Sequence, residues 1–392
     1  MPSLLHEIEE YEPRKAECFE PERIVLAKGS EKYFSEENLI QKIIALYPQA
    51  EIVQAWTTPH NQASLLGSKR DSNKDIPASL ALHNRGKQTL VFSEHNSSVR
   101  YSSEEGNTCP NYWHFSLYGF CPYGCTYCYL AGTPGVHFAP GVKMFLNVDE
   151  VLRKIHRQAQ SNGCETSFYP GKLQDGLALD PLSGYSLQTI PFFAHEQYAR
   201  QIILTKSSDV QNLLSLEHNG KTILSWTLSP PEISAVYEPN TPSVLSRMEA
   251  MKQCDAKGYP VRAVLMPIIP IENWPDLYAA FIEQLLGMVP ITRLTIGCIC
   301  SYTTALGLQN QKLGKNNVIT NNMIRSHLKE EDGRIRYPLD LRVKAYEHLV
   351  HKAKQIRPDL EIGLCLETNE ILHGSSDILS YNTTQGKCNC VL

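Results

Sequence analysis

The chain has 392 residues, of which 42% are hydrophobic and 20% are charged, and its formal net charge at pH 7 is −4. This composition is typical of a globular protein and excludes a disordered chain, a collagen-like repeat and a small disulfide scaffold. No apolar run approaches the roughly 20 residues that a membrane-spanning helix needs. Because the N-terminus also lacks the pattern of a secretory signal, we expect a cytoplasmic protein without membrane contact.

The first 108 residues predict a small N-terminal α/β domain. Short apolar runs predict three strands, at 24–29, 51–56 and 89–94. A helical apolar period at 35–46 predicts an amphipathic helix between the first two strands.

Residues 109–310 alternate strand-like and helix-like patterns. The predicted strands are 112–119, 166–170, 201–206, 222–229, 261–268 and 292–301, and the predicted helices between them are 148–160, 209–217, 243–258 and 277–289. Nearly continuous apolar strands that alternate with helices are typical of a parallel sheet covered by helices. Six such units favour an α/β fold with a partial (β/α)6 TIM-like barrel and an N-terminal α/β extension, rather than a doubly wound sheet.

The remainder of the chain predicts a C-terminal extension at 311–372 and a tail. The extension contains a helix at 340–356 and a strand at 361–367, and it is rich in Lys and Arg. These cations indicate either a solvated helix face or a surface that faces phosphate. The polar tail at 373–392 carries Cys388 and Cys390, and we expect it to be mobile.

Three of the twelve cysteines form a C-x3-C-x2-C motif of Cys121, Cys125 and Cys128. Closely spaced cysteines are typical ligands of a 4Fe–4S cluster, and three ligands leave one iron open. An aromatic residue, Tyr127, precedes the last cysteine. The other interpretations are a zinc site completed by a distant histidine and a set of buried structural thiols.

The motif is that of the radical S-adenosylmethionine (SAM) superfamily, and the sequence around it resembles the spore photoproduct lyase family. The resemblance covers about residues 20–350, and its most distinctive segments are 58–62, 87–91, 125–130, 204–206, 218–222, 237–243, 256–261 and 267–274. It implies that a one-electron donor of the flavodoxin or ferredoxin type reduces the cluster. The cluster then cleaves SAM to a 5′-deoxyadenosyl radical that removes a substrate hydrogen. In that family the substrate is a methylene-bridged thymine dimer in spore DNA.

The resemblance also implies which residues bind the cofactor. Lys206, which follows Leu-Thr, matches a lysine that contacts SAM, and Thr227 matches a serine with the same role. Ser229 is a weaker candidate. Gln174 stands where the family has a small hydroxyl residue near SAM.

Further matches concern the reaction itself. Tyr127 and Tyr129 match aromatic residues near the active site, and Tyr129 is expected to relay hydrogen atoms or electrons. One departure is chemically important, because Lys172 occupies the place of the family's hydrogen-donating cysteine. An ammonium N–H is too strong to quench a carbon radical, whereas a thiol S–H is not. Lys172 could instead bind a phosphate or carboxylate of the substrate.

Other cysteines could replace the missing donor. Cys298 and Cys300 lie two residues apart on one predicted strand, so we expect them to point to the same face. They could supply the donor, or they could bind a second metal centre, with Cys388 and Cys390 completing it or serving as a redox relay. Otherwise they are ordinary core residues and the tail pair has no role.

The sequence therefore predicts a radical SAM enzyme with lyase or related radical chemistry. We expect its substrate to be a nucleobase, a nucleotide, a peptide or another small molecule. One alternative is repair of spore photoproduct in DNA. The alternative from another class is an iron–sulfur or zinc protein that binds nucleic acid without catalysis.

Overall fold

The computed structural model describes residues 11–35, 38–67, 76–172, 174–323, 332–371 and 387–392. Part of the predicted tail, residues 373–386, therefore lies outside the described residues. Within them, no helix is long and apolar enough to span a bilayer.

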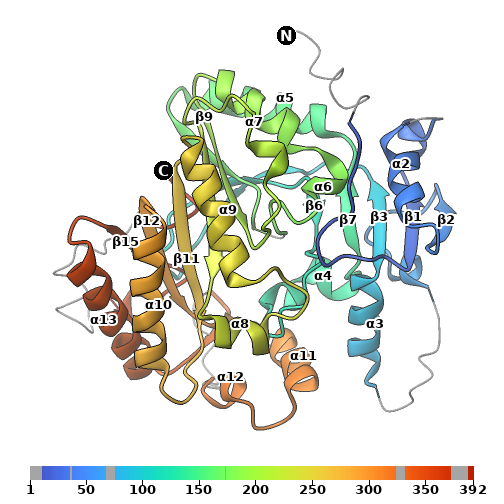
Figure 1. Cartoon of the computed structure of the whole chain (residues 1–392). Coiled ribbons are helices and arrows are strands. Elements are labelled where there is room, and N and C mark those ends of the chain that lie inside the picture. The colour runs from blue at the N-terminus through green and yellow to red at the C-terminus, as the bar shows by residue number, and fades with distance from the viewer. Residues whose placement is uncertain (1–10, 36–37, 68–75, 173, 324–331, 372–386) are drawn as a thin grey trace.

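The chain forms two main sheets with helices around them (Figure 1). The first sheet has the strand order β2-β1-β3-β7-β6 and carries α2 (Leu39–Leu46) and α3 (Ala78–Lys87). Its strands are β1 (Arg23–Ala27), β2 (Glu51–Ala55), β3 (Thr89–Ser93), β6 (Tyr118–Gly119) and β7 (Val142–Phe145). All are parallel except β6, which runs antiparallel to β7. Because β6 and β7 come from beyond residue 108, this sheet extends past the end of the predicted N-terminal domain.

The second sheet has eight strands in the order β15-β12-β11-β10-β9-β8-β5-β4. They are β4 (Val99–Ser102), β5 (Tyr112–Phe115), β8 (Thr166–Tyr169), β9 (Ala199–Thr205), β10 (Thr222–Leu228), β11 (Val261–Ile268), β12 (Arg293–Cys298) and β15 (Glu361–Leu364). All neighbours pair in parallel except β4 and β5. The six strands from β5 to β12 confirm the predicted partial barrel. The sheet is open, with β4 and β15 at its edges.

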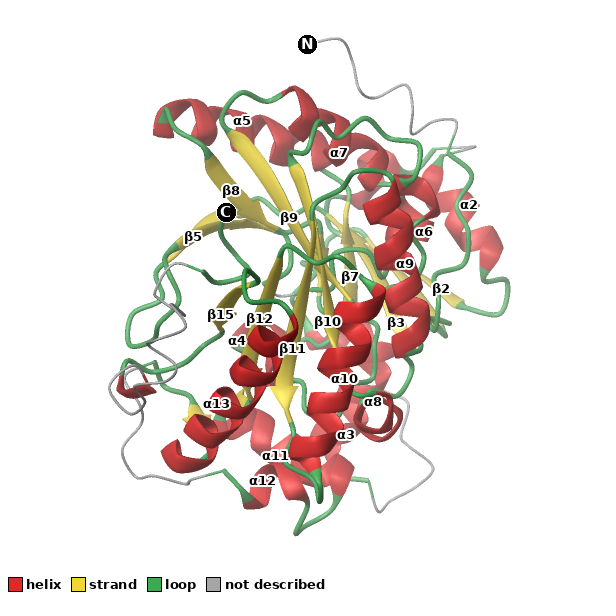
Figure 2. Ribbon diagram, turned by 60° about the vertical axis from the view of Figure 1, so that its left-hand side comes forward, coloured by secondary structure: helices red, strands yellow, loops and turns green. Residues whose placement is uncertain are grey.

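Helices cover the outer face of this second sheet, as Figure 2 shows for α9, α10 and α13. The long ones are α5 (Val148–Asn162), α7 (Ser186–His195), α9 (Val244–Ala256), α10 (Trp274–Met288) and α13 (Leu339–Ile356). Shorter helices near the strand ends are α4 (Pro134–Phe138), α6 (Asp180–Ser183), α8 (Pro231–Tyr237), α11 (Thr303–Leu313) and α12 (Val318–Asn321).

Local sequence signals fix the ends of several of these helices. Ser243 caps α9 by accepting a hydrogen bond from the Ser246 amide. α5 ends at Gly163, whose φ of 62° is left-handed. The predicted helix at 209–217 does not form, since this segment contains only the 3-10 turn η4 (Gln211–Leu213).

The last described residues, 387–392, lie against the first halves of the barrel strands. Arg262 in β11 donates to the Val391 carbonyl at 2.6 Å, and Arg293 in β12 donates to the Cys388 carbonyl at 2.9 Å. A Cβ on Gly363 in β15 would lie 1.8 Å from the Lys387 carbonyl oxygen, so the close approach requires glycine. These six residues, which we call the C-terminal plug, are therefore docked in the barrel.

Candidate active site

A cavity lies at the carboxyl ends of the parallel strands of the second sheet. Its walls include Lys172 after β8, Lys206 after β9, Thr227 near the end of β10, Ile299 after β12 and Leu366 after β15. Ligands of parallel α/β folds bind at this end, because the loops that follow the strands converge there.

The loop that carries Cys121, Cys125 and Cys128 enters this cavity, and all three cysteines line it. The loop follows β6 and is fixed to the segment after α8. The Gly124 amide donates to the Pro239 carbonyl at 3.0 Å, and a Cβ on Gly124 would lie 2.8 Å from that oxygen.

The chemistry of this loop suits a metal. Burial raises the pKa of the Cys125 thiol to about 11, so its deprotonated sulfur requires a cation beside it. An iron–sulfur cluster would supply that cation, and three cysteines on one loop fit three of its corners.

Lys206 lies on a buried network of charges beside the cysteine loop. Its Nζ is 3.6 Å from Glu238 Oε1 and 5.9 Å from the centre of the Tyr127 ring. Glu238 also accepts a hydrogen bond from the Tyr127 hydroxyl, and its Oε2 is 2.7 Å from Arg247 Nη1. Burial raises the pKa of Glu238, but the cations Lys206 and Arg247 outweigh this and lower it to about 2. Glu238 is therefore an anion that holds Lys206 at the cavity wall.

Asp175 and Gln174 organise the loop after β8. Asp175 accepts hydrogen bonds from the Thr205 hydroxyl at 2.6 Å and from the Lys206 amide at 2.7 Å. Gln174 Oε1 accepts from the Tyr118 amide at 2.8 Å, whereas its buried Nε2 has no hydrogen-bond partner among the described residues. Gln174 lines the cavity, but the surrounding atoms cover this nitrogen.

The two hydroxyl candidates for cofactor binding lie in different places. Thr227 lines the cavity together with Gln174 and Lys206. Ser229 is fully buried, and it is not among the residues that line the cavity. The structure thus brings three of the four candidates together and leaves Ser229 apart.

Lys172 lines the cavity but already has an anionic partner. Its Nζ is 2.8 Å from Glu104 Oε1, and Arg334 Nη2 is 3.9 Å from Oε2 of the same carboxylate. Burial raises the pKa of Glu104, yet Lys172 and Arg334 lower it below its usual value. Arg334 is bound more closely by Asp332, whose Oδ2 is 2.8 Å from Arg334 Nη1, so each of the two cations already has a carboxylate partner.

The two cysteines proposed as substitutes for the donor do not share a face. β12 ends at Cys298, whose amide donates to the Tyr346 hydroxyl at 2.7 Å, and Cys298 is absent from the cavity lining. Cys300 begins β13 (Cys300–Ser301), which pairs with β14 (Ile335–Arg336), and it lines the cavity together with Tyr129. The expected continuous strand breaks at Ile299, so only Cys300 faces the site.

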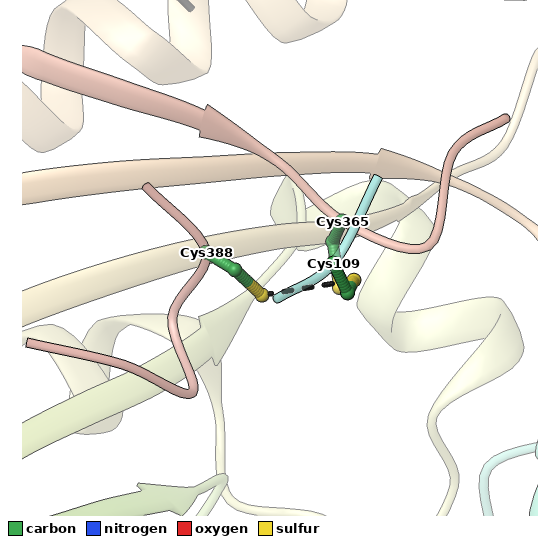
Figure 3. A group of neighbouring side chains, drawn as sticks. All are labelled: Cys109, Cys365 and Cys388. Atoms are coloured by element: carbon green, nitrogen blue, oxygen red, sulfur yellow. Dashed lines mark hydrogen bonds between the residues drawn. The ribbon is translucent and has the colours of Figure 1, made fainter. Parts of the chain in front are cut away.

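The structure adds a second group of thiols that sequence reasoning did not assemble. The sulfurs of Cys109, Cys365 and Cys388 all lie within 4.8 Å of one another (Figure 3). Cys390 lies beside Cys388, and it lines the cavity with Cys109 and Cys365. The Cys-x-Cys pair of the tail was a signal for this group, but Cys109 and Cys365 belong to no local pattern.

Residues 19–297 match the family model described as "Spore photoproduct lyase", which is more than half of the chain. The chain belongs to the spore photoproduct lyase family. The members of this family are enzymes of the radical SAM class.

Individual spore photoproduct lyases resemble the chain at modest identity. The Bacillus subtilis (strain 168) enzyme is 26% identical over 235 residues, which is 60% of this chain and 65% of the relative, so just under two thirds of that relative is matched. The Geobacillus sp. (strain Y412MC61) enzyme is 25% identical over 268 residues, or 68% of this chain and 71% of the relative.

Solved structures of spore photoproduct lyase have the same fold. A cysteine-to-serine mutant superposes with a TM-score of 0.74 at 21% identity, covering 88% of this chain and 98% of that one. A double mutant with bound AdoMet and dinucleoside spore photoproduct gives a TM-score of 0.74 at 20% identity, with the same coverage.

Proposed function

We propose that this chain is a radical SAM lyase acting on a nucleobase substrate of the spore photoproduct type. Cys121, Cys125 and Cys128 would hold the 4Fe–4S cluster. The observation that carries the proposal is that these cysteines line one cavity with Lys206 and other predicted cofactor residues, at the strand ends where such folds bind ligands. When bound, the cluster and SAM supply a 5′-deoxyadenosyl radical that removes one hydrogen atom from the substrate.

The residues around the loop suit the polar end of SAM. The Lys206 cation can pair with a carboxylate. The Thr227 hydroxyl can donate or accept one. Asp175 fixes the Lys206 backbone through its amide, which keeps the cation at a constant place.

The far side of the cavity suits a base with attached phosphate. Tyr112 and Tyr169 both line it, with ring centres 5.8 Å apart and an edge-to-face arrangement. Aromatic side chains of this kind stack on nucleobases. Lys172 and Arg334, each paired with a carboxylate, could also donate hydrogen bonds to a phosphate. The names of the relatives and the dinucleoside in one solved structure point to the same class of substrate.

Cys300 is the proposed hydrogen donor to the product radical. Its S–H bond would break, the hydrogen atom would pass to the carbon radical, and a thiyl radical would remain on Cys300. Tyr129, which lines the same cavity, would return a hydrogen atom to that sulfur and would then carry the unpaired electron on its phenolic oxygen. Lys172 has no part in this step, since its ammonium group is paired with Glu104.

Anaerobic reconstitution with iron, sulfide, dithionite and SAM tests the reaction class. We expect release of 5′-deoxyadenosine, and we expect none from a variant with Cys121, Cys125 and Cys128 all changed to Ala. A cluster-loaded wild-type protein that releases none would contradict the proposal and favour the non-catalytic binding protein. A flavodoxin or ferredoxin should replace dithionite.

Dinucleoside spore photoproduct tests the substrate. We expect its conversion to thymine dinucleoside, and Cys300→Ala should keep 5′-deoxyadenosine formation while diverting the product. Cys298→Ala is the matched control and should give the normal product. If 5′-deoxyadenosine forms but the photoproduct is unchanged, the substrate is a different nucleobase, peptide or small molecule.

A further inference from the structure

Four cysteines from three distant segments meet beside the active-site cavity. Cys109 precedes β5, Cys365 follows β15, and Cys388 and Cys390 belong to the C-terminal plug. The Cys388 and Cys109 sulfurs are 3.8 Å apart, and the Cys365 sulfur lies within 4.8 Å of both. In Figure 3 the Cys109 and Cys365 side chains lie together and Cys388 points toward them from the opposite side. Cys390 contacts Cys388, but its sulfur is outside the group of three that lie within 4.8 Å of one another, so it is a candidate for a fourth ligand.

This thiol group lies where the first and last parallel strands of the open barrel approach each other. The Thr108 amide donates to the Glu367 carbonyl at 2.6 Å, which joins the segment before β5 to the segment after β15. The next contact is between the Leu366 amide and the Cys109 sulfur, at 3.2 Å. An amide that donates to sulfur stabilises a thiolate, as the groups around metal-bound cysteines do.

The spacing of the sulfurs fits a single ion. A tetrahedral zinc ion about 2.3 Å from each cysteine sulfur holds those sulfurs about 3.8 Å apart. That is the separation of Cys388 and Cys109. A four-iron cluster would separate its cysteines more widely, because each sulfur binds a different iron corner. A set of four cysteine sulfurs also matches the ligand preference of zinc.

The surroundings can balance the charge of such a site. Four thiolates around a divalent zinc ion carry a net charge of −2. Arg262 and Arg293 bind the backbone of the plug through the carbonyls of Val391 and Cys388. Their guanidinium groups therefore lie beside the cysteine pair of the plug. Glu361 pairs with Arg293, and Lys387 lies 3.7 Å from the same carboxylate, so these four side chains have a net charge of +2.

We propose that Cys109, Cys365, Cys388 and Cys390 bind a zinc ion that is separate from the metal site of the cysteine loop. The ion ties the C-terminal plug to the segments before β5 and after β15 and forms part of the cavity wall. Cys300 is not one of the four proposed ligands, so the zinc site leaves it free.

Metal analysis of protein purified anaerobically and loaded with iron and sulfide tests the proposal. We expect about one zinc per chain in the wild type in addition to the iron. Cys365→Ser and Cys388→Ser should lose the zinc while keeping iron and its visible absorption. The triple alanine variant of the cysteine loop should do the reverse. Cys164→Ser, at an exposed cysteine outside both groups, should keep both metals.

Zinc-edge X-ray absorption of the wild type tests the site without any variant, and so does not depend on whether a variant folds. We expect a shell of sulfur at about 2.3 Å from zinc. Zinc below about 0.2 per chain after growth with added zinc would overturn the proposal, as would a nitrogen or oxygen shell. A disulfide between Cys109 and Cys388 in the unreduced protein would also overturn it. None of these outcomes depends on release of 5′-deoxyadenosine, so the zinc site and the proposed reaction can fail separately.

Discussion

Glu238 and Arg247 form an ion pair whose side chains are both fully buried. Arg247 also donates to the backbone carbonyls of Pro242 and Thr227, so it connects the start of α9 to the end of β10. The same carboxylate positions Lys206 at the cavity wall. Losing one member of a buried charge pair lowers the free energy of unfolding strongly, because the other charge then remains buried without a partner.

We expect Arg247→Met to lower the free energy of unfolding by about 3–5 kcal/mol, since the more distant Lys206 would be the cation left beside Glu238. Adding Glu238→Gln should restore part of this loss, because it removes the unpaired charge. Urea unfolding followed by circular dichroism measures both effects. A loss below about 1 kcal/mol in the single variant would show that the pair is not needed.

The exposed pair of Lys252 and Glu249, 3.1 Å apart on α9, is the matched control. Lys252→Ala should change stability by less than about 0.5 kcal/mol, because solvent screens exposed pairs.

The residues predicted from sequence were those with a local signature. The cysteine loop and Lys206 stand within short motifs, and all of these residues line the cavity. Glu238 lies within one of the segments that carried the family resemblance, but its role depends on Tyr127, which is 111 positions away. Cys109 and Cys388 are separated by 279 positions, and no spacing rule joins residues so far apart.

At the level of elements, the C-terminal plug and β15 fit together through the missing side chain of Gly363. We expect Gly363→Ala to displace the plug, because the new Cβ would lie 1.8 Å from the Lys387 carbonyl oxygen. Limited trypsin digestion should then cleave faster after Lys387, and the zinc content should fall.

Gly287→Ala is the matched control for this experiment. Gly287 lies in α10, and a Cβ there would meet no atom within 4 Å. In a helix this change is neutral or stabilising by up to about 1 kcal/mol. Equal trypsin sensitivity of the two variants would contradict the fit of the plug.

The strand predicted at 292–301 is two elements, β12 and β13, and the break between them could not be seen in the sequence. The pairing of β11 with β12 shifts register between Leu265 and Ile268, where Pro267 has no amide to donate. The apolar run of one strand does not reveal a register shift in the strand that pairs with it. The period of two that placed Cys298 and Cys300 on one face therefore fails at Ile299.

For the whole molecule, buried histidines predict sensitivity to acid. Burial lowers the pKa of His60, His95 and His114 to about 4 and that of His83 to about 2. The unfolded chain takes up these protons near pH 6.5, before the folded chain does. Stability is therefore fully present above pH 6.5 and is lost as the pH falls toward 4.

We expect the free energy of unfolding, measured by urea titration, to fall steadily between pH 6.5 and 4.5, by about 1 kcal/mol per pH unit for each histidine that stays neutral. His83→Gln should reduce this slope, since His83 is buried against Lys312, 2.9 Å away. His351→Gln, on the exposed side of α13, should leave the slope unchanged. A flat profile in the wild type would contradict the assignment.

The overall architecture was predictable because parallel strands and covering helices leave periodic signals in the sequence. All six predicted barrel strands are present in the second sheet, although the first and last extend over less of the chain than expected. The sequence did not predict that β6 and β7 belong to the first sheet, since the neighbours of a strand depend on contacts between distant segments. The docking of residues 387–392 has the same cause, as their partners lie on β11 and β12.

The plug has a consequence for how a large substrate would approach. It covers the first halves of the barrel strands, and the bond from Thr108 to Glu367 joins the segment before β5 to the segment after β15. The approach therefore lies among the loops at the opposite end. A base in a polynucleotide would have to rotate out of its stack to arrive there. Its flanking sugars would remain outside, so lengthening the nucleic acid should tighten binding without altering the chemistry at the base.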